Sequence, residues 1–156
     1  MQQKRCYFDI ETSYNRQITV LGVYYETGET VQLIQGEITP HKLSKIFRNT
    51  RAYSYNGSRF DIPVIKKCTG FNIENFACTR DLMYDCWDNN LKGGLKKVEK
   101  ILGIGRETEG IDGKEAMRLW EEYSSYGSRE ALDTLLQYNY EDVKNLEILR
   151  RKLEVD

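Results

Sequence analysis

The stretch Cys6-Tyr7-Phe8-Asp9-Ile10-Glu11-Thr12 is the most informative part of this sequence. Residues 6–10 form a short apolar run interrupted only by Asp9, which indicates a central strand covered on both faces. Because side chains alternate along a strand, Asp9 and Glu11 point to the same face, with Cα atoms roughly 6.6 Å apart. Two carboxylates there repel each other and lose hydration, and a divalent cation would resolve the conflict. The alternative is that Glu11 has already left the sheet and is solvated.

Outward from this stretch, strand-like and helix-like segments follow in an order typical of an α/β fold with a mixed sheet. We expect strands at residues 6–10, 18–25, 30–34, 52–55 and 76–79, with Glu26-Thr27-Gly28-Glu29 closing a hairpin. We expect helices at residues 41–48, 62–67, 95–102 and 114–126, a helical turn at Asp81, and one or two helices across residues 129–153. The length fits a single domain over residues 1–156.

Composition excludes several classes of protein. The 23 Lys and Arg residues nearly balance the 24 Asp and Glu residues, so the molecule as a whole has no positive field that would attract nucleic acid. Binding of nucleic acid would therefore need a local basic patch and metal ions. We expect no signal peptide, because the N-terminus runs straight into a predicted core strand, and no apolar run is long enough to span a membrane. We therefore expect a cytoplasmic protein without membrane contact. The cysteines, Cys6, Cys68, Cys78 and Cys86, form no C-x-x-C pair, and His41 is the sole histidine. We therefore expect reduced, mostly buried thiols rather than a zinc site or a disulfide framework.

Two further acids stand at positions that suit a site. Asp61 follows a predicted strand and a glycine-containing loop and begins a predicted helix, where ligand sites of α/β sheets occur. The alternative for Asp61 is a simple helix N-cap. Asp142 is four residues after Tyr138, so the two side chains share one helix face near the core edge. The alternative for Asp142 is a surface acid beside a core-capping tyrosine.

Other polar and aromatic residues have more ordinary interpretations. Lys92, Lys96 and Lys100 would share a helix face that either follows a phosphate backbone or is simply solvated. Asp81 is interpreted as a helix cap, and Asp85, Asp88 and Asp112 are placed outside any metal site. Three tyrosines are expected in the core rather than as platforms on which bases stack: Tyr53, Tyr55 and Tyr140. The last basic cluster, Arg150, Arg151 and Lys152, is expected to complement the helix dipole.

Together the acids form a pattern that resembles the DnaQ-like exonuclease superfamily. Its three motifs are matched by Phe8-Asp9-Ile10-Glu11-Thr12, by Asn56-Gly57 followed by Phe60-Asp61-Ile62-Pro63, and by the tyrosine variant (DEDDy) Tyr138-x-x-x-Asp142. Tyr138-Asn139-Tyr140-Glu141-Asp142 and the stretch 94–103 look most like the YprB-like group, which is related to the proofreading domain of family B DNA polymerases. The resemblance covers nearly the whole chain, and its specificity comes from the three motifs together.

The resemblance implies a ribonuclease-H-like fold, with a mixed five-stranded sheet flanked by helices. It also implies two divalent ions, Mg²⁺ or Mn²⁺, held by Asp9, Glu11, Asp61 and Asp142, with Asp9 bridging both ions. Tyr138 would orient the attacking water. Thr12 and Asn56 would contact the terminal nucleotide, and Phe60 would either support that pocket or pack in the core.

The implied function is metal-dependent 3′→5′ exonuclease activity that releases 5′-nucleoside monophosphates from a single-stranded 3′ end of DNA or RNA. Three alternatives remain open at this stage: a structure-specific endonuclease of the same fold, a non-catalytic nucleic-acid-binding module, and a single structural ion at Asp9 and Glu11. A protein partner that supplies specificity is a further hypothesis.

Overall fold

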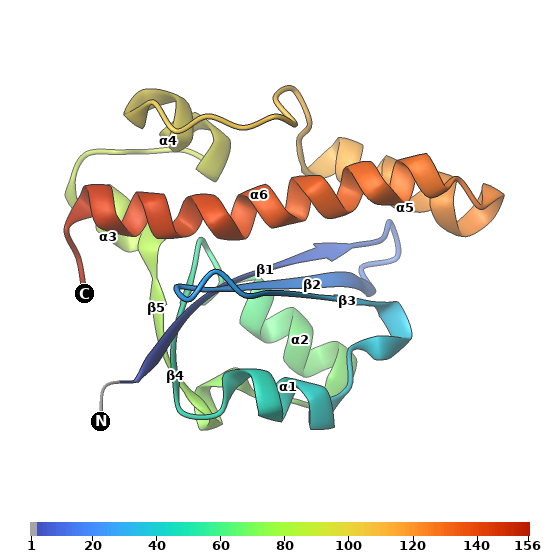
Figure 1. Cartoon of the computed structure of the whole chain (residues 1–156), viewed down its shortest axis with the longest axis horizontal. Coiled ribbons are helices and arrows are strands. Elements are labelled where there is room, and N and C mark those ends of the chain that lie inside the picture. Colours follow the sequence, from blue (N-terminus) through green and yellow to red (C-terminus); the bar gives the residue numbers. More distant parts are fainter. Residues whose placement is uncertain (1–2) are drawn as a thin grey trace.

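The computed structural model describes residues 3–156 and shows a five-stranded mixed sheet with helices on both faces (Figure 1). The strands are β1 (Lys4–Thr12), β2 (Ile18–Tyr25), β3 (Thr30–Ile34), β4 (Thr50–Ser54) and β5 (Ala77–Asp81). They lie in the order β3-β2-β1-β4-β5, in which β1 is antiparallel to β2 and parallel to β4. The α/β class and the mixed five-stranded sheet are therefore confirmed, and β1 is the central strand.

In the described part of the chain, six α-helices surround this sheet. They are α1 (Pro40–Phe47), α2 (Asp61–Thr69), α3 (Leu82–Asp88), α4 (Leu95–Leu102), α5 (Gly113–Tyr126) and α6 (Arg129–Leu153), with short 3₁₀ helices at Gln35–Glu37 and Ile73–Asn75. The sequence left open one or two helices over 129–153, and the structure has one continuous helix. β1 extends two residues further at each end than predicted, because Lys4 pairs with β4 and Thr12 pairs with β2.

The two faces of β1 are covered by different helices. Phe8 and Ile10 lie in a fully apolar cluster with residues of α1 and α2, and the Phe8 ring meets the Phe47 ring edge-on at 5.4 Å. Tyr7 points the other way, into a cluster with Val143 and other residues of α6. The alternation along one strand therefore supplies two cores, and Asp9 and Glu11 belong to the α6 side.

Helix α6 crosses this side of the sheet close to β1 and β2 (Figure 1). Gly22 of β2 pairs with Asp9, and a Cβ atom at Gly22 would lie 2.0 Å from Oδ1 of Asn139 on α6. Only glycine leaves room for this approach. The same close packing brings Asp142, one turn further along α6, toward the acids of β1.

Several sequence-based expectations are wrong in detail. All four cysteines are free, but only Cys6 and Cys86 are buried, because Cys78 lies on the edge strand β5 and Cys68 near the end of α2. Tyr140 is only half-buried, whereas Tyr53 is fully buried.

Among the described residues, no helix is long and apolar enough to cross a membrane.

The basic residues are also arranged differently from the prediction. Lys92 precedes α4, which begins only after Gly93 and Gly94, so Lys92, Lys96 and Lys100 do not share one helix face. Arg150, Arg151 and Lys152 lie in the last turn of α6, as expected for residues that complement the helix dipole, but Arg150 has a second role. It is buried and donates hydrogen bonds to the Tyr7 hydroxyl at 2.7 Å and to Glu26 at 3.1 Å, because α6 passes directly over β1 there.

Candidate metal centre

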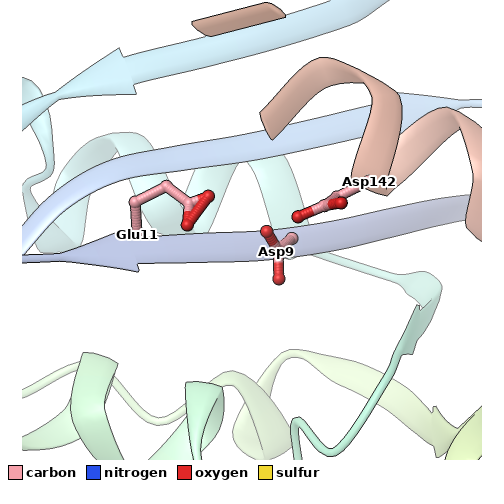
Figure 2. A group of neighbouring side chains, drawn as sticks. All are labelled: Asp9, Glu11 and Asp142. Atoms are coloured by element: carbon pink, nitrogen blue, oxygen red, sulfur yellow. The ribbon is translucent and has the colours of Figure 1, made fainter. Parts of the chain in front are cut away.

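Three carboxylates gather where α6 passes over β1. Asp9 and Glu11 point from β1 toward Asp142 of α6, and one ligand oxygen from each lies within 4.8 Å of the others (Figure 2). Asp9 is partly accessible, whereas Glu11 and Asp142 are buried. The alternatives of a solvated Glu11 and a surface Asp142 are therefore wrong.

The electrostatics of this group favour a bound cation. Burial, reinforced by Asp142 and Glu11, raises the pKa of Asp9 well above its ordinary range. Burial and Asp142 also raise the pKa of Glu11. The Oε2 atom of Glu11 is buried and has no hydrogen-bond partner among residues 3–156. Three crowded carboxylates with one orphaned oxygen fit a hard divalent cation, because such ions prefer oxygen ligands and stabilise the ionised acids.

Asn139 connects α6 to β1 beside the acids. Its side-chain amide donates to the Asp9 backbone oxygen at 3.3 Å and lies 3.4 Å from Asp9 Oδ2. Gln32 of β3 donates to Asn139 Oδ1 at 3.0 Å, which fixes the orientation of the amide. Sequence reasoning assigned no role to Asn139. Asn139 nevertheless stands inside the quoted motif Tyr138–Asp142, and Gly22, a glycine inside a strand, is a second signal that a neighbouring element approaches closely.

Two buried or half-buried cations flank Asp142. Its Oδ1 atom accepts from Lys96 Nζ at 2.9 Å and from Arg106 Nη2 at 2.7 Å. Burial alone would lower the pKa of Lys96, but Asp142, Tyr138 and Asp9 outweigh it and hold the pKa above its ordinary value. Lys96 therefore stays charged beside the acids.

Arg106 is itself held by a buried network. Its guanidinium donates twice to the Glu99 carboxylate, at 3.0 and 2.7 Å, and Glu99 also accepts from Asn145 at 2.9 Å. Arg106 lies in a loop outside every quoted motif, whereas Glu99 on α4 lies inside the stretch 94–103 that carries the resemblance, although no role was assigned to it. Asn145 is one helical turn after Asp142, which is a further weak signal of this network.

Asp61 does not join the group of three carboxylates. It is buried at the first position of α2, and its Oδ2 atom accepts from the backbone N–H of Ile10 at 3.1 Å. Burial raises the pKa of Asp61 to about 7. The N-cap position of α2 is occupied by Phe60, so the N-cap alternative for Asp61 is wrong. Asp61 instead holds the backbone of β1 between Asp9 and Glu11.

Tyr138 lies beside the acids, buried on α6. The Lys96 ammonium sits 4.4 Å from the centre of its ring, and the Arg106 guanidinium sits 5.5 Å away. Burial, followed by the charge of Asp142, raises the pKa of the Tyr138 hydroxyl above its ordinary value. At neutral pH the hydroxyl therefore keeps its proton and can donate a hydrogen bond.

None of the three predicted substrate residues belongs to the group of three carboxylates. Thr12 ends β1 at a bulge directly after Glu11. Asn56 has φ of 60°, and its backbone N–H donates to Asp81 Oδ1 at 2.8 Å. Phe60 is 43% exposed, so the core alternative for it is wrong. Asp81 caps α3 as predicted, and it also accepts from Ser58, which fixes the loop that carries Asn56 and Phe60.

Comparisons with known proteins agree with this architecture. A search of curated protein sequences finds no match. Among solved structures, the family B DNA polymerase from the hyperthermophilic archaeon Pyrobaculum calidifontis superimposes with a TM-score of 0.75 and 18% identity, over 99% of this chain and 25% of the polymerase chain. The chain thus spans a quarter of that polymerase, and at this identity the likeness concerns the fold alone. A family model described as the RNase_H superfamily matches residues 6–154. Because this match covers nearly the whole chain, the protein belongs to the ribonuclease H superfamily.

Proposed function

We propose that this chain, as one ribonuclease-H-like domain, is a metal-dependent 3′→5′ exonuclease that hydrolyses single-stranded nucleic acid to 5′-nucleoside monophosphates. Membership of the superfamily supports a nuclease-type function. The observation that carries the proposal is the convergence of Asp9, Glu11 and Asp142 within 4.8 Å, with Tyr138 one turn before Asp142. The resemblance of the three motifs to the DEDDy, YprB-like exonucleases supports the 3′→5′ polarity.

Asp9, Glu11 and Asp142 would hold the divalent ions, and the donor set of carboxylate oxygens suits Mg²⁺ or Mn²⁺. When bound, such ions activate water and stabilise negative charge on a phosphodiester. Asp61 remains a predicted ligand, and its contact with Ile10 gives it a second role in positioning β1. Asn139 would keep Asp9 oriented toward the site.

The groups around the acids match the charge changes of phosphodiester hydrolysis. Tyr138, protonated at neutral pH, would orient the attacking water rather than remove its proton. Lys96, which is one-third exposed beside Asp142, could also meet an approaching phosphodiester, and such preorganised charge stabilises a developing oxyanion. Arg106 is buried between Glu99 and Asp142 and would position Asp142. Thr12, Asn56 and Phe60 would contact the terminal nucleotide, for which the exposed ring of Phe60 is available.

The test uses single-stranded DNA and RNA labelled at the 3′ or the 5′ end, with Mg²⁺, with Mn²⁺ and with a chelator. We expect the 3′ label to leave as a mononucleotide and the 5′-labelled strand to shorten stepwise, in both cases only with metal. Asp9→Ala should reduce the rate by at least about 100-fold, because changes in the surroundings of metal ligands already cost 10–100-fold.

The matched control is Asp133→Ala, which removes an exposed acid of α6 whose one ion pair within residues 3–156 is with Arg129. This variant should retain the parent rate. Cleavage of circular single strands would instead support the endonuclease alternative. Absence of turnover on every substrate, with metal binding intact, would support a non-catalytic module and contradict the proposal.

A further inference from the structure

Helix α3 and the loops beside it carry an aromatic pair at the surface. Tyr84 and Trp87 meet edge-on with ring centres 5.2 Å apart, and they are 42% and 37% exposed. The other tryptophan, Trp120, is packed in the core with 4% exposure. Single exposed rings such as Tyr126 are ordinary, but Tyr84 and Trp87 lie together and form a small aromatic surface, and such a surface can mark a binding site.

Two cations from different segments approach the Trp87 ring. The Arg59 guanidinium lies 5.8 Å and the Lys92 ammonium 5.3 Å from its centre. Within residues 3–156, no carboxylate lies within salt-bridge distance of either cation, although Asp88 follows Trp87 in the chain. Both charges are therefore free to meet an anionic ligand. We call these four residues, Arg59, Tyr84, Trp87 and Lys92, the Trp87 patch.

The Trp87 patch is joined to the metal centre along the chain on both sides. Arg59 is followed by Phe60 and Asp61, and Asp81 binds this loop to the start of α3. On the other side, Lys92 is four residues before Lys96, whose ammonium reaches Asp142. Four residues span at most about 14 Å. A strand whose end lies at the carboxylates could therefore extend over this patch.

We propose that the Trp87 patch binds single-stranded nucleic acid, with a base stacked on Trp87 and phosphates held by Arg59 and Lys92. Aromatic rings between basic side chains are the combination that binds single strands, because every base has a stacking face and every nucleotide carries a phosphate. The proposal rests on the proposed function, since it takes the occupant to be the strand whose 3′ end reaches the metal centre.

The experiment exploits the different exposure of the two tryptophans. A single-stranded oligonucleotide is titrated into the protein in chelator, so that binding is measured without hydrolysis, by tryptophan fluorescence and by anisotropy of a label on the oligonucleotide. Binding should quench the exposed Trp87 and leave the buried Trp120 unaffected. Trp87→Phe should lose the quench and retain most of the binding. Trp87→Ala should weaken binding roughly 5- to 150-fold, the range found for stacking on an aromatic side chain.

The cations are tested by the dependence of binding on salt. Arg59→Gln and Lys92→Gln should each reduce the slope of log K against log salt by about 0.7, the contribution of one single-strand phosphate contact. Matched controls are Tyr126→Ala, an aromatic residue 85% exposed at the end of α5, and Lys42→Gln on α1, on the opposite face of the sheet. Neither control should alter the affinity or the slope.

The outcomes separate this proposal from the exonuclease proposal. If Trp87→Ala and its Tyr126→Ala control bind the oligonucleotide equally well, the patch proposal is overturned whether or not the protein hydrolyses nucleic acid, and a protein partner becomes the better occupant. If Trp87→Ala binds weakly but no substrate is hydrolysed with metal, the patch proposal stands and the exonuclease proposal fails. Circular dichroism melting should show each variant folded.

Discussion

On one face of β1, Phe8 and Ile10 pack against α1 and α2, whereas on the other face Asp9 and Glu11 meet Asp142 of α6. These four residues alternate along the same strand. The two faces therefore have the same backbone and differ only in their side chains and in the helices that cover them. The apolar face gains free energy by burial. The acidic face holds like charges together, with an orphaned oxygen on Glu11. One strand thus combines a stabilising face with a face that costs stability without its ligand, a compromise typical of functional sites.

The largest effect is expected from the apolar face. Phe8 is fully buried and packs edge-on against Phe47. Phe8→Ala should lower the free energy of unfolding by about 3–5 kcal/mol, because it removes a buried ring and leaves a cavity. Urea unfolding followed by circular dichroism measures the loss. A change below about 1 kcal/mol would mean that this face contributes little to stability and would remove the contrast.

The acidic face should respond in the opposite direction. In chelator at pH 8, Asp9→Asn should raise the free energy of unfolding by about 0.5–2 kcal/mol. The substitution removes a buried charge and its repulsion from Asp142 and Glu11, and burial and this repulsion are what raise the pKa of Asp9. The variant should also lose most of the increase in melting temperature that Mn²⁺ gives the parent protein.

The matched control for this acid is Asp85→Asn on α3. The Asp85 carboxylate is paired with Arg80 through two hydrogen bonds of 2.9 and 2.7 Å, so its replacement should cost about 1 kcal/mol. Destabilisation of equal size in both variants would show that Asp9 is an ordinary paired acid and not part of a strained group.

Asp61 provides the most specific test, because its effect is confined to one window of pH. Burial raises its pKa to about 7, compared with 3.8 for an ordinary aspartate. Between these values the folded protein retains a proton that the unfolded chain has released, so the stability contributed by Asp61 is present at low pH and is lost as pH rises toward 7. In chelator, the free energy of unfolding should therefore decline less steeply between pH 5 and 8 in Asp61→Asn than in the parent.

In Asp61→Asn the free energy of unfolding should still decline in part as the pH rises, because the pKa values of Asp9 and Glu11 are also raised. Asparagine can still accept the hydrogen bond from Ile10, so the local structure is preserved. Unfolding in urea at four pH values measures the slope of the free energy of unfolding against pH. Identical slopes for Asp61→Asn and the parent would contradict the raised pKa of Asp61.

Where the local sequence pattern is strong, the predicted first and last residues of an element agree with the structure. The structure has Ile18–Tyr25, Thr30–Ile34 and Leu95–Leu102 with the expected bounds, because turn residues and glycines mark their ends. Boundaries were less certain where pairing decides them, as in β1, whose ends are set by β2 and β4. The short 3₁₀ helix at Ile73–Asn75 was not predicted, since three residues carry no periodicity.

The sequence by itself determined which acids share a side. Alternation puts Asp9 and Glu11 on one face of β1, and helical spacing puts Tyr138 and Asp142 on one face of α6. Only the tertiary structure decided how close these pairs come, because that distance depends on the fit of Asn139 against Gly22. It also decided that Lys96 and Arg106 neutralise Asp142, and that Asp61 binds the backbone of Ile10. Charges interact over distance in space, and residues far apart in the sequence become neighbours only when the sheet and helices have packed.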